Sequence, residues 1–581
     1  MRFEQKRLKG LFEDHYTHYE IPEYQRAYQW DTFEKKRRNQ VKEFWEDLNE
    51  FIDSGSEFPL GNIIILKKGD KHQIVDGQQR LTTALILLSA IIRQLEKEGY
   101  LKMAKELKEN YLIFEEKEFR QIKLQPQQYD INFWEEFIVN GKEEETPKTF
   151  SQKRIKEAYT FFKEELEGVG FEKLQKIREK LANSLIGVLE LTNEREASSI
   201  FELQNDRGKR LTDLEKVKAF LMYQILTSEG NSQDIGYIYR EFERIYQIIN
   251  SPNFPNEDSI LSHYLQAYRG YRIDEEKVPK LKKEIKGKKG AERISFIKGI
   301  AKGLRESFEA MEEFLKDDRE IAYYLRDLQK EFNFSFAYPF LIKSYNLFRE
   351  NPEKLEKILF YLEKIVFIHN LANTRAKIGS RLHPYLKKLR KETEPEELFN
   401  EIYHRLTREY YWTERQIKGV LAGDMNQKLT RYILKRYEIH LRKGSKEGYP
   451  SELYTIDIYK GKEEERKGWW IEHIAPQTEN REGDSGYESY DKDFLENYLN
   501  SLGNLILTSE EHNRNLGNRK FSQKLASYKN SPMLHHREVA QFAEEGKWTK
   551  RAIEERGSKI GEFILEEWGL ERNFPNRSGG K

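Results

Sequence analysis

The sequence contains no cysteine, and this absence excludes three kinds of chemistry. Without cysteine there is no disulfide, no zinc site built on thiolates and no cysteine nucleophile. An excess of either charge is also missing, because 100 Lys and Arg residues stand against 99 Asp and Glu residues. The net charge of +1 gives no general indication of nucleic-acid binding, which must therefore depend on local patches.

Long apolar runs are missing as well. The longest, at residues 81–92, has 12 residues, whereas a membrane helix needs about 20. The first residues, MRFEQKRLKGLFEDH, show no apolar core of the kind found in signal peptides. We therefore expect no membrane partner and a cytoplasmic location.

The chain does contain enough aromatic bulk for hydrophobic cores, since Phe, Tyr and Trp make up 13% of its 581 residues. A chain of this length usually forms several domains. Short β-rich runs at residues 62–66, 72–75 and 186–191 lie among helical patterns, and helical spacing continues through residues 231–442. We predict an α+β fold in which helix predominates, with domains at residues 1–230, 231–443 and 444–581.

Two segments near the C-terminus combine residue types that suit phosphodiester hydrolysis. WWIEHIAPQ occupies residues 469–477, and LGNLILTSEEHNRNLGNRKF occupies residues 502–521. We expect a strand that ends at Glu472-His473, a second strand at residues 505–508 and a helix from Glu510 onward. This order resembles the HNH, or ββα-metal, nuclease core. An isolated histidine on an apolar strand is usually inert, but the combined motif is far more specific.

Each of these side chains has a chemical reason to be there. His473 is the natural general base for activating water near neutral pH. Glu472 and the amide oxygen of Asn513 are hard ligands for Mg²⁺ or Mn²⁺. The usual acid before the histidine is Asp rather than Glu, and His512 beside Asn513 leaves the last ligand open.

The resemblance to the HNH core adds one role, and the chemistry of phosphate binding adds another. The resemblance implies that Asn504 holds the base in position. Cationic side chains in this region suit contacts with the DNA backbone. The candidates for these contacts are Lys520 and Lys524.

Three polar clusters stand out in the first 220 residues: IPEYQRAYQW (21–30), IVDGQQR (74–80) and FELQNDRGKRLT (201–212). A strand, a turn at Gly77 and a helix start form a good phosphate-binding arrangement, to which Arg80 adds a charged fork. For the DGQQR segment alone, a turn followed by a surface ion pair would be the favoured reading. No Walker-type phosphate loop occurs.

Together, the three clusters resemble the N-terminal domain of GmrSD-like modification-dependent restriction enzymes, which looks like the ParB nucleotide-binding fold. The resemblance implies that a nucleoside triphosphate, GTP or ATP, binds here. The candidate residues are Gln25, Arg26, Asp76, Gln78, Gln79, Arg80, Asn205 and Arg207.

Both ends of the chain therefore indicate one architecture, a nucleotide-binding module fused to an HNH nuclease. The resemblance implies a metal-dependent DNA endonuclease that cuts modified phage DNA in antiphage defence and is regulated by nucleotide. Two alternatives stay open: a ParB-like DNA-binding protein that no longer cuts, and a nuclease that ignores nucleotide. A homo-oligomer is compatible with the sequence, which does not determine the oligomeric state.

Overall fold

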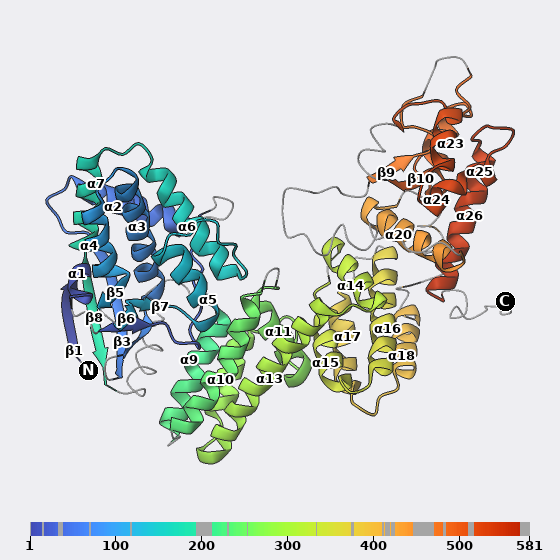
Figure 1. Ribbon diagram of the computed structural model, residues 1–581. Coiled ribbons are helices and arrows are strands. Elements are labelled where there is room, and N and C mark those ends of the chain that lie inside the picture. Colours follow the sequence, from blue (N-terminus) through green and yellow to red (C-terminus); the bar gives the residue numbers. More distant parts are fainter. Residues whose placement is uncertain are drawn as a thin grey trace. The chain divides into compact units, whose positions relative to one another are not determined.

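The computed structural model describes most of the chain (Figure 1). The described residues are 2–13, 17–32, 39–68, 71–116, 119–192, 212–228, 232–251, 254–332, 334–372, 377–408, 412, 419, 425–445, 470–479, 484–508 and 516–569.

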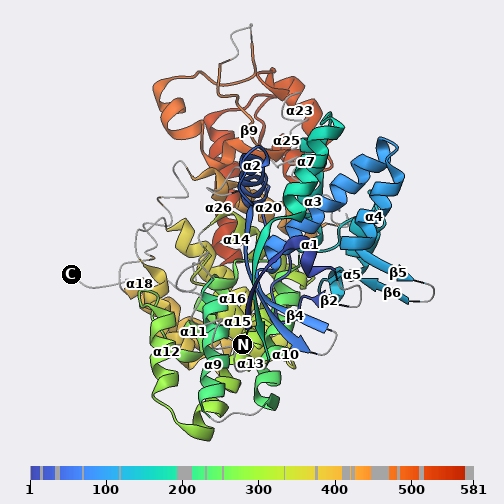
Figure 2. The same cartoon turned by 90° about the vertical axis from the view of Figure 1, so that its left-hand side faces the viewer.

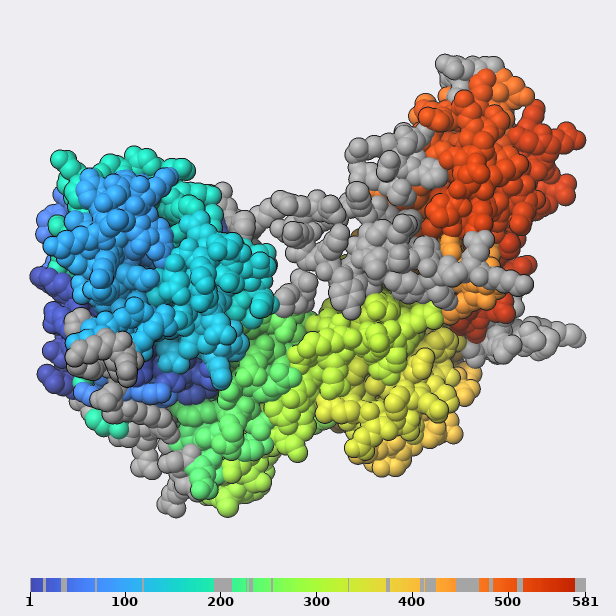
Figure 3. Space-filling model, in the orientation of Figure 1, coloured from blue at the N-terminus to red at the C-terminus, as the bar shows by residue number. Residues whose placement is uncertain are grey.

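The chain divides into two compact units. The first comprises Met1–Leu265 with Asp274–Glu312, and the second comprises Gln266–Ile273 with Glu313–Lys581. The blue and cyan residues of the first unit form one closely packed body in the space-filling view (Figure 3). The predicted division into three domains stays a prediction.

A six-stranded mixed sheet forms the centre of the first unit, with strand order β1-β8-β3-β4-β2-β7. The strands are β1 (Arg2–Arg7), β2 (His18–Glu20), β3 (Pro59–Lys68), β4 (Lys71–Asp76), β7 (Leu124–Gln125) and β8 (Leu185–Leu191). A separate hairpin joins β5 (Ile113–Glu116) to β6 (Phe119–Ile122). The three predicted β-rich runs are confirmed as β3, β4 and β8.

Helix α3 (Gln78–Lys97) is the central helix of this unit. Its apolar residues from Leu81 to Leu95 are buried on nearly every side, as expected for a helix without a polar face. It packs against α4, α6 and α7. The helices of this part are α1 (Leu8–Leu11), α2 (Gln40–Ile52), α4 (Leu101–Tyr111), α5 (Gln128–Phe133), η1 (Trp134–Val139), α6 (Phe150–Leu166) and α7 (Phe171–Ala182).

Helices make up nearly all of the described chain from residue 212 to residue 445, which confirms the fold class. They are α9 (Asp213–Thr227), α10 (Ser232–Ile249), α11 (Glu257–Arg269), α12 (Lys277–Lys286), α13 (Gly290–Lys316), α14 (Glu320–Glu331), α15 (Tyr338–Phe348), α16 (Pro352–Leu371), α17 (Ile378–Lys388), α18 (Pro395–Arg408) and α20 (Gln427–Lys443). Among the described helices, none combines the length and apolarity that crossing a membrane requires.

The C-terminal part of the second unit is built around a two-stranded sheet of β9 (Trp470–His473) and β10 (Leu505–Thr508). Both predicted strands are confirmed, whereas the start of the helix expected from Glu510 lies outside the described residues. The remaining elements are η2 (Phe494–Tyr498), η3 (Leu502–Asn504), α23 (Phe521–Lys529), α24 (Leu534–Arg537), α25 (Val539–Phe542) and α26 (Lys550–Glu567).

Replacing Gly77 with alanine should destabilise the first unit by about 2–4 kcal/mol. Gly77 has φ +86°, and a Cβ there would lie 2.7 Å from the carbonyl oxygen of Asn62. The matched control is Gly99→Ala, since Gly99 has φ +87° but no atom within 4 Å of the added Cβ, so it should lose only about 1 kcal/mol. Urea unfolding measures both, and equal losses would show that the close approach at Gly77 is unimportant.

Candidate active site

The two-stranded sheet places the predicted catalytic pair at one end of β9. The strands run antiparallel, with His473 opposite Leu505 and Glu472 opposite Ile506. Strands of four residues carry few ladder hydrogen bonds, so the hairpin depends on its surroundings for stability. The side chains at its end face a polar cavity of about 600 Å³.

His473 is held by a residue that sequence reasoning missed. Its Nε2 lies 3.0 Å from Oδ1 of Asn500, in the turn between η2 and η3. Both side chains line the cavity, together with polar groups from three other segments. These groups are Gln427 and Thr430 of α20, Gln477 and Thr478 after β9, and Asn518.

Glu472 forms an ion pair beneath the hairpin. The Nζ of Lys524 donates to Oε1 of Glu472 at 2.7 Å and to the backbone carbonyl of His473 at 2.7 Å. Burial raises the pKa of Glu472, and the ammonium group of Lys524 opposes that rise. The side chain of Lys524 is fully buried, so the structure places it under the active-site strand rather than on an exposed surface. Lys520, the other predicted DNA contact, is half-buried at the start of α23.

Asn504 is completely buried and ties the chain that follows His473 to the hairpin. Its Oδ1 accepts from the Ala475 N–H at 2.8 Å and from Trp548 Nε1 at 3.0 Å. Its Nδ2 donates to the carbonyls of Leu499 at 2.7 Å and Ala475 at 3.1 Å. Asn504 can therefore position His473 through the backbone.

The donor atoms around the cavity suit a hard cation. Glu472 supplies a carboxylate, and the side-chain amides of Asn500 and Asn518 belong to residues that line the same cavity. Mg²⁺ keeps several water ligands, so it needs only one or two protein carboxylates. Among the described residues there is no group of three His, Asp or Glu side chains that could hold a metal. Asn513 and His512, between which the last ligand was left open, lie outside the described residues.

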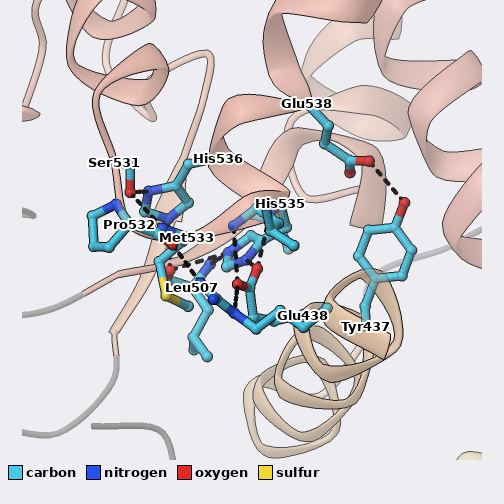
Figure 4. A network of polar contacts seen from close by, with 12 residues as sticks. Tyr437, Glu438, Leu507, Ser531, Pro532, Met533, His535, His536 and Glu538 are labelled. Atoms are coloured by element: carbon cyan, nitrogen blue, oxygen red, sulfur yellow. Dashed lines mark hydrogen bonds and ion pairs between the residues drawn. The ribbon is translucent and has the colours of Figure 1, made fainter. Parts of the chain in front are cut away.

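The outer edge of β10 is buried, and side chains satisfy its backbone groups (Figure 4). The carbonyl of Leu505 accepts from Arg556 Nη1 at 2.9 Å. The N–H of Leu507 donates to His535 Nε2 at 3.1 Å, and its carbonyl accepts from His536 Nε2 at 2.8 Å. An unpaired buried backbone group would cost roughly 1–3 kcal/mol, so these side chains replace a third strand.

Glu438 of α20 organises this edge. Its carboxylate accepts from His535 Nδ1 at 2.7 Å, from the N–H groups of Leu534 and His535 at 2.9 Å each, and from Arg442 Nε at 2.7 Å. Burial raises the pKa of Glu438, but the bonds from His535 and Leu534 outweigh burial and lower it to about 2. The contact with Glu438 fixes the orientation of the His535 ring, whose Nε2 lies 3.1 Å from the Leu507 nitrogen and 3.2 Å from the Leu507 carbonyl oxygen.

In the first unit, the three predicted glutamines hold the backbone around the start of α3. Gln25 Nε2 donates to the Val75 carbonyl at 2.9 Å. Gln78 Nε2 donates to the Arg26 carbonyl at 2.8 Å, and Gln79 Nε2 donates to the Ala27 carbonyl at 3.0 Å. The glutamines thus fasten residues 25–29 against the helix start.

The predicted charged residues lie around the same helix start. Arg26 forms ion pairs with Glu215, at 3.1 Å, and with Glu257. The guanidinium of Arg80 lies over Gly61, where an added Cβ would be 2.5 Å from Nη1. Partial exclusion of water raises the pKa of Asp76. The Gly77 N–H and the Arg80 guanidinium oppose this rise without cancelling it.

The remaining candidates at this end of the chain are Asn205 and Arg207, which lie outside the described residues. Sequence reasoning missed Lys218, whose buried Nζ donates to the Tyr24 carbonyl at 2.5 Å. Burial lowers the pKa of Lys218 to about 7. Nothing local in the helical pattern of α9 marks this lysine as buried.

Replacing Glu438 with glutamine should destabilise the second unit by about 3 kcal/mol at pH 7. The folded pKa of about 2 lies below the ordinary value of 4.5, so the stabilisation is present above pH 4.5 and is lost as pH falls toward 2. The difference between wild type and Glu438→Gln in urea unfolding should therefore be smaller at pH 3 than at pH 7. Glu562→Gln, at an exposed position of α26, is the control. A pH-independent difference would contradict the assignment.

Comparison with protein families gives two matches. The N-terminal domain of the GmrSD restriction endonuclease matches residues 8–222, and the C-terminal domain of GmrSD restriction endonucleases matches residues 407–563. A comparison with curated proteins gave no significant match. The first match contains five strands of the sheet, all but β1, and the start of α3. The second contains α20, the β9–β10 hairpin and most of the helices around it. The chain therefore belongs to the GmrSD family of type IV restriction endonucleases.

Proposed function

We propose that this restriction endonuclease cuts modified phage DNA with the help of a divalent metal, under the control of a nucleotide. The observation that carries the proposal is the position of Glu472 and His473. These consecutive residues end β9, and both line a polar cavity. His473 acts as the general base that activates a water molecule. Asn500 fixes the plane of the imidazole ring, and Asn504 fixes the chain that follows it.

The metal, Mg²⁺ or Mn²⁺, would be held by Glu472 and Asn513, with His512 as the alternative to Asn513. When bound, the metal stabilises negative charge on the phosphate and on the leaving oxygen. Lys524 orients the Glu472 carboxylate and the His473 carbonyl from below. A direct contact of Lys524 with DNA would require these two bonds to open, so Lys520 is the better candidate for the DNA backbone.

The nucleotide site lies at the start of α3. The free N–H groups of a helix start favour phosphate, and Arg80 adds a cation beside them. Asp76, Arg26 and the three glutamines shape this site, and Asn205 and Arg207 complete the candidate set. GTP or ATP bound here would gate DNA cleavage.

One observation favours the alternative of a nuclease that ignores nucleotide. Gln25, Gln78, Gln79 and Arg26 all bond to the protein itself. The first unit could then be a DNA reader only. Nucleotide binding by the full chain separates the two possibilities.

His473→Ala should reduce DNA cleavage by about 10²- to 10⁴-fold, because a general base supplies roughly that factor. The melting temperature and DNA affinity should stay as in the wild type, since His473 is only half-buried. His404→Ala, at an exposed position in the same unit, is the control and should cut normally. Wild-type cleavage by His473→Ala would remove the assignment.

Arg80→Ala should weaken GTP or ATP binding by about 10- to 100-fold, the effect of one charge-assisted phosphate contact. Arg80→Lys should retain part of the affinity because it keeps the charge. Arg7→Ala is the matched control, as Arg7 is also exposed and pairs with Glu57 away from α3. Calorimetry gives the affinities, and equal values in all variants would dismiss the nucleotide site.

A further inference from the structure

A short segment of the first unit is strongly basic although the whole chain is neutral. Residues 277–289 contain seven lysines and one acidic residue, Glu284. Over the whole sequence, basic and acidic residues are present in almost equal number, at 100 and 99. Local excess of one charge is the electrostatic feature by which a protein attracts a polyanion.

The fold displays these lysines on one outer face. Helix α12 buries Leu281 and Ile285 and packs against α9 (Figure 2). Lys283, Lys286 and Lys289 are exposed, and Lys282 is half-buried. We call these four residues the α12 lysine surface.

Carboxylates neutralise other lysines of the segment but not these four. Lys280 pairs with Glu275 at 2.8 Å, and Lys288 pairs with Glu292 at 2.5 Å. In the part of the chain that the structure describes, no carboxylate forms an ion pair with a lysine of the α12 lysine surface. Lys283 shares a surface hollow with Glu275, Glu276 and Glu284 but forms no ion pair with them, so all four ammonium groups can bind a partner.

Stabilisation of the helix end does not account for so many cations. Lysines in the last turn interact favourably with the helix dipole. However, Arg293 already donates to the carbonyl of Lys288 at 2.7 Å and to that of Lys286 at 3.3 Å. Further ammonium groups add mutual repulsion there. The ring of Phe220 holds two of them in place, with Lys282 Nζ at 4.9 Å and Lys286 Nζ at 5.7 Å from its centre.

We propose that the α12 lysine surface binds the sugar-phosphate backbone of DNA at a place outside the cleavage site. Lys282 and Lys286 are one helical turn apart, about 6 Å along the axis. This rise spans about two phosphates of one strand, at roughly 3.4 Å each. Lysine contacts with phosphate carry no sequence information. The surface would therefore hold DNA of any sequence and keep it on the enzyme.

DNA is the partner that the family indicates, because its members act on DNA. The proposal does not depend on His473 or on nucleotide, since binding can be measured without cleavage. The test variant is the triple substitution Lys283→Gln, Lys286→Gln and Lys289→Gln in the full chain. Its charge-preserving partner replaces the same three residues with arginine. The matched control replaces Lys97, Lys102 and Lys173, three exposed lysines of the same unit, with glutamine.

The affinity for an unmodified duplex is measured by fluorescence anisotropy in EDTA, between 50 and 200 mM salt. Each phosphate contact contributes about 0.9 to the slope of log affinity against log salt, so the glutamine triple should lower that slope by roughly three. Over this range the wild type should lose about 40-fold more affinity than the triple variant. The arginine triple and the control should behave as the wild type. An unchanged slope in the glutamine triple, or an equal loss in the control, would overturn the proposal.

Discussion

The active-site hairpin depends on one constraint: the buried outer edge of β10 must have its backbone groups satisfied. Two strands of four residues make few hydrogen bonds to each other, and no third strand pairs with β10 in the described chain. Arg556, His535 and His536 take the place of that strand. Because β9 pairs with β10 along its whole length, the location of His473 depends on this side-chain edge as well as on Asn500, Asn504 and Lys524.

The side chains that satisfy β10 are themselves held by the helical part of the second unit. Glu438 of α20 fixes His535, and two other residues of α20 line the cavity. Farther along, Trp568 Nε1 donates to the buried Glu363 of α16 at 3.0 Å, and Arg436 of α20 pairs with the same carboxylate at 3.3 Å. The family match accordingly begins at residue 407, before α20. These helices are structural supports of the hairpin that carries the proposed catalytic residues.

Sequence reasoning succeeded where the signal was local. The run at residues 505–508 and the DGQQR turn each predicted an element that the structure contains, because strand propensity and a left-handed glycine act over a few residues. It could not find Asn500 or the Glu438–His535 pair, because 97 residues separate the members of that pair and only the fold brings them together. Lys524 was predicted to contact the DNA backbone, but its side chain is fully buried in an ion pair with Glu472, and only the fold shows this.

The proposed nucleotide site shows a similar limit of sequence reasoning. The sequence identified the residues around the start of α3, but it could not show that Arg26 pairs with Glu215 and Glu257. A nucleotide at this site can gate cleavage only if it binds the cutting and non-cutting states with different affinity. The proposed nucleotide site and the proposed nuclease site lie on one chain. A nucleotide gate would therefore protect the host chromosome from the nuclease.

The most direct test of this account is the rate at which the full chain cleaves phage DNAs of differing base modification. The rates are measured in Mg²⁺, in Mn²⁺ and in EDTA, each with and without GTP or ATP. The account predicts cleavage that requires the divalent metal and changes severalfold when nucleotide is added. Cleavage in EDTA, or equal rates with and without nucleotide, would contradict it.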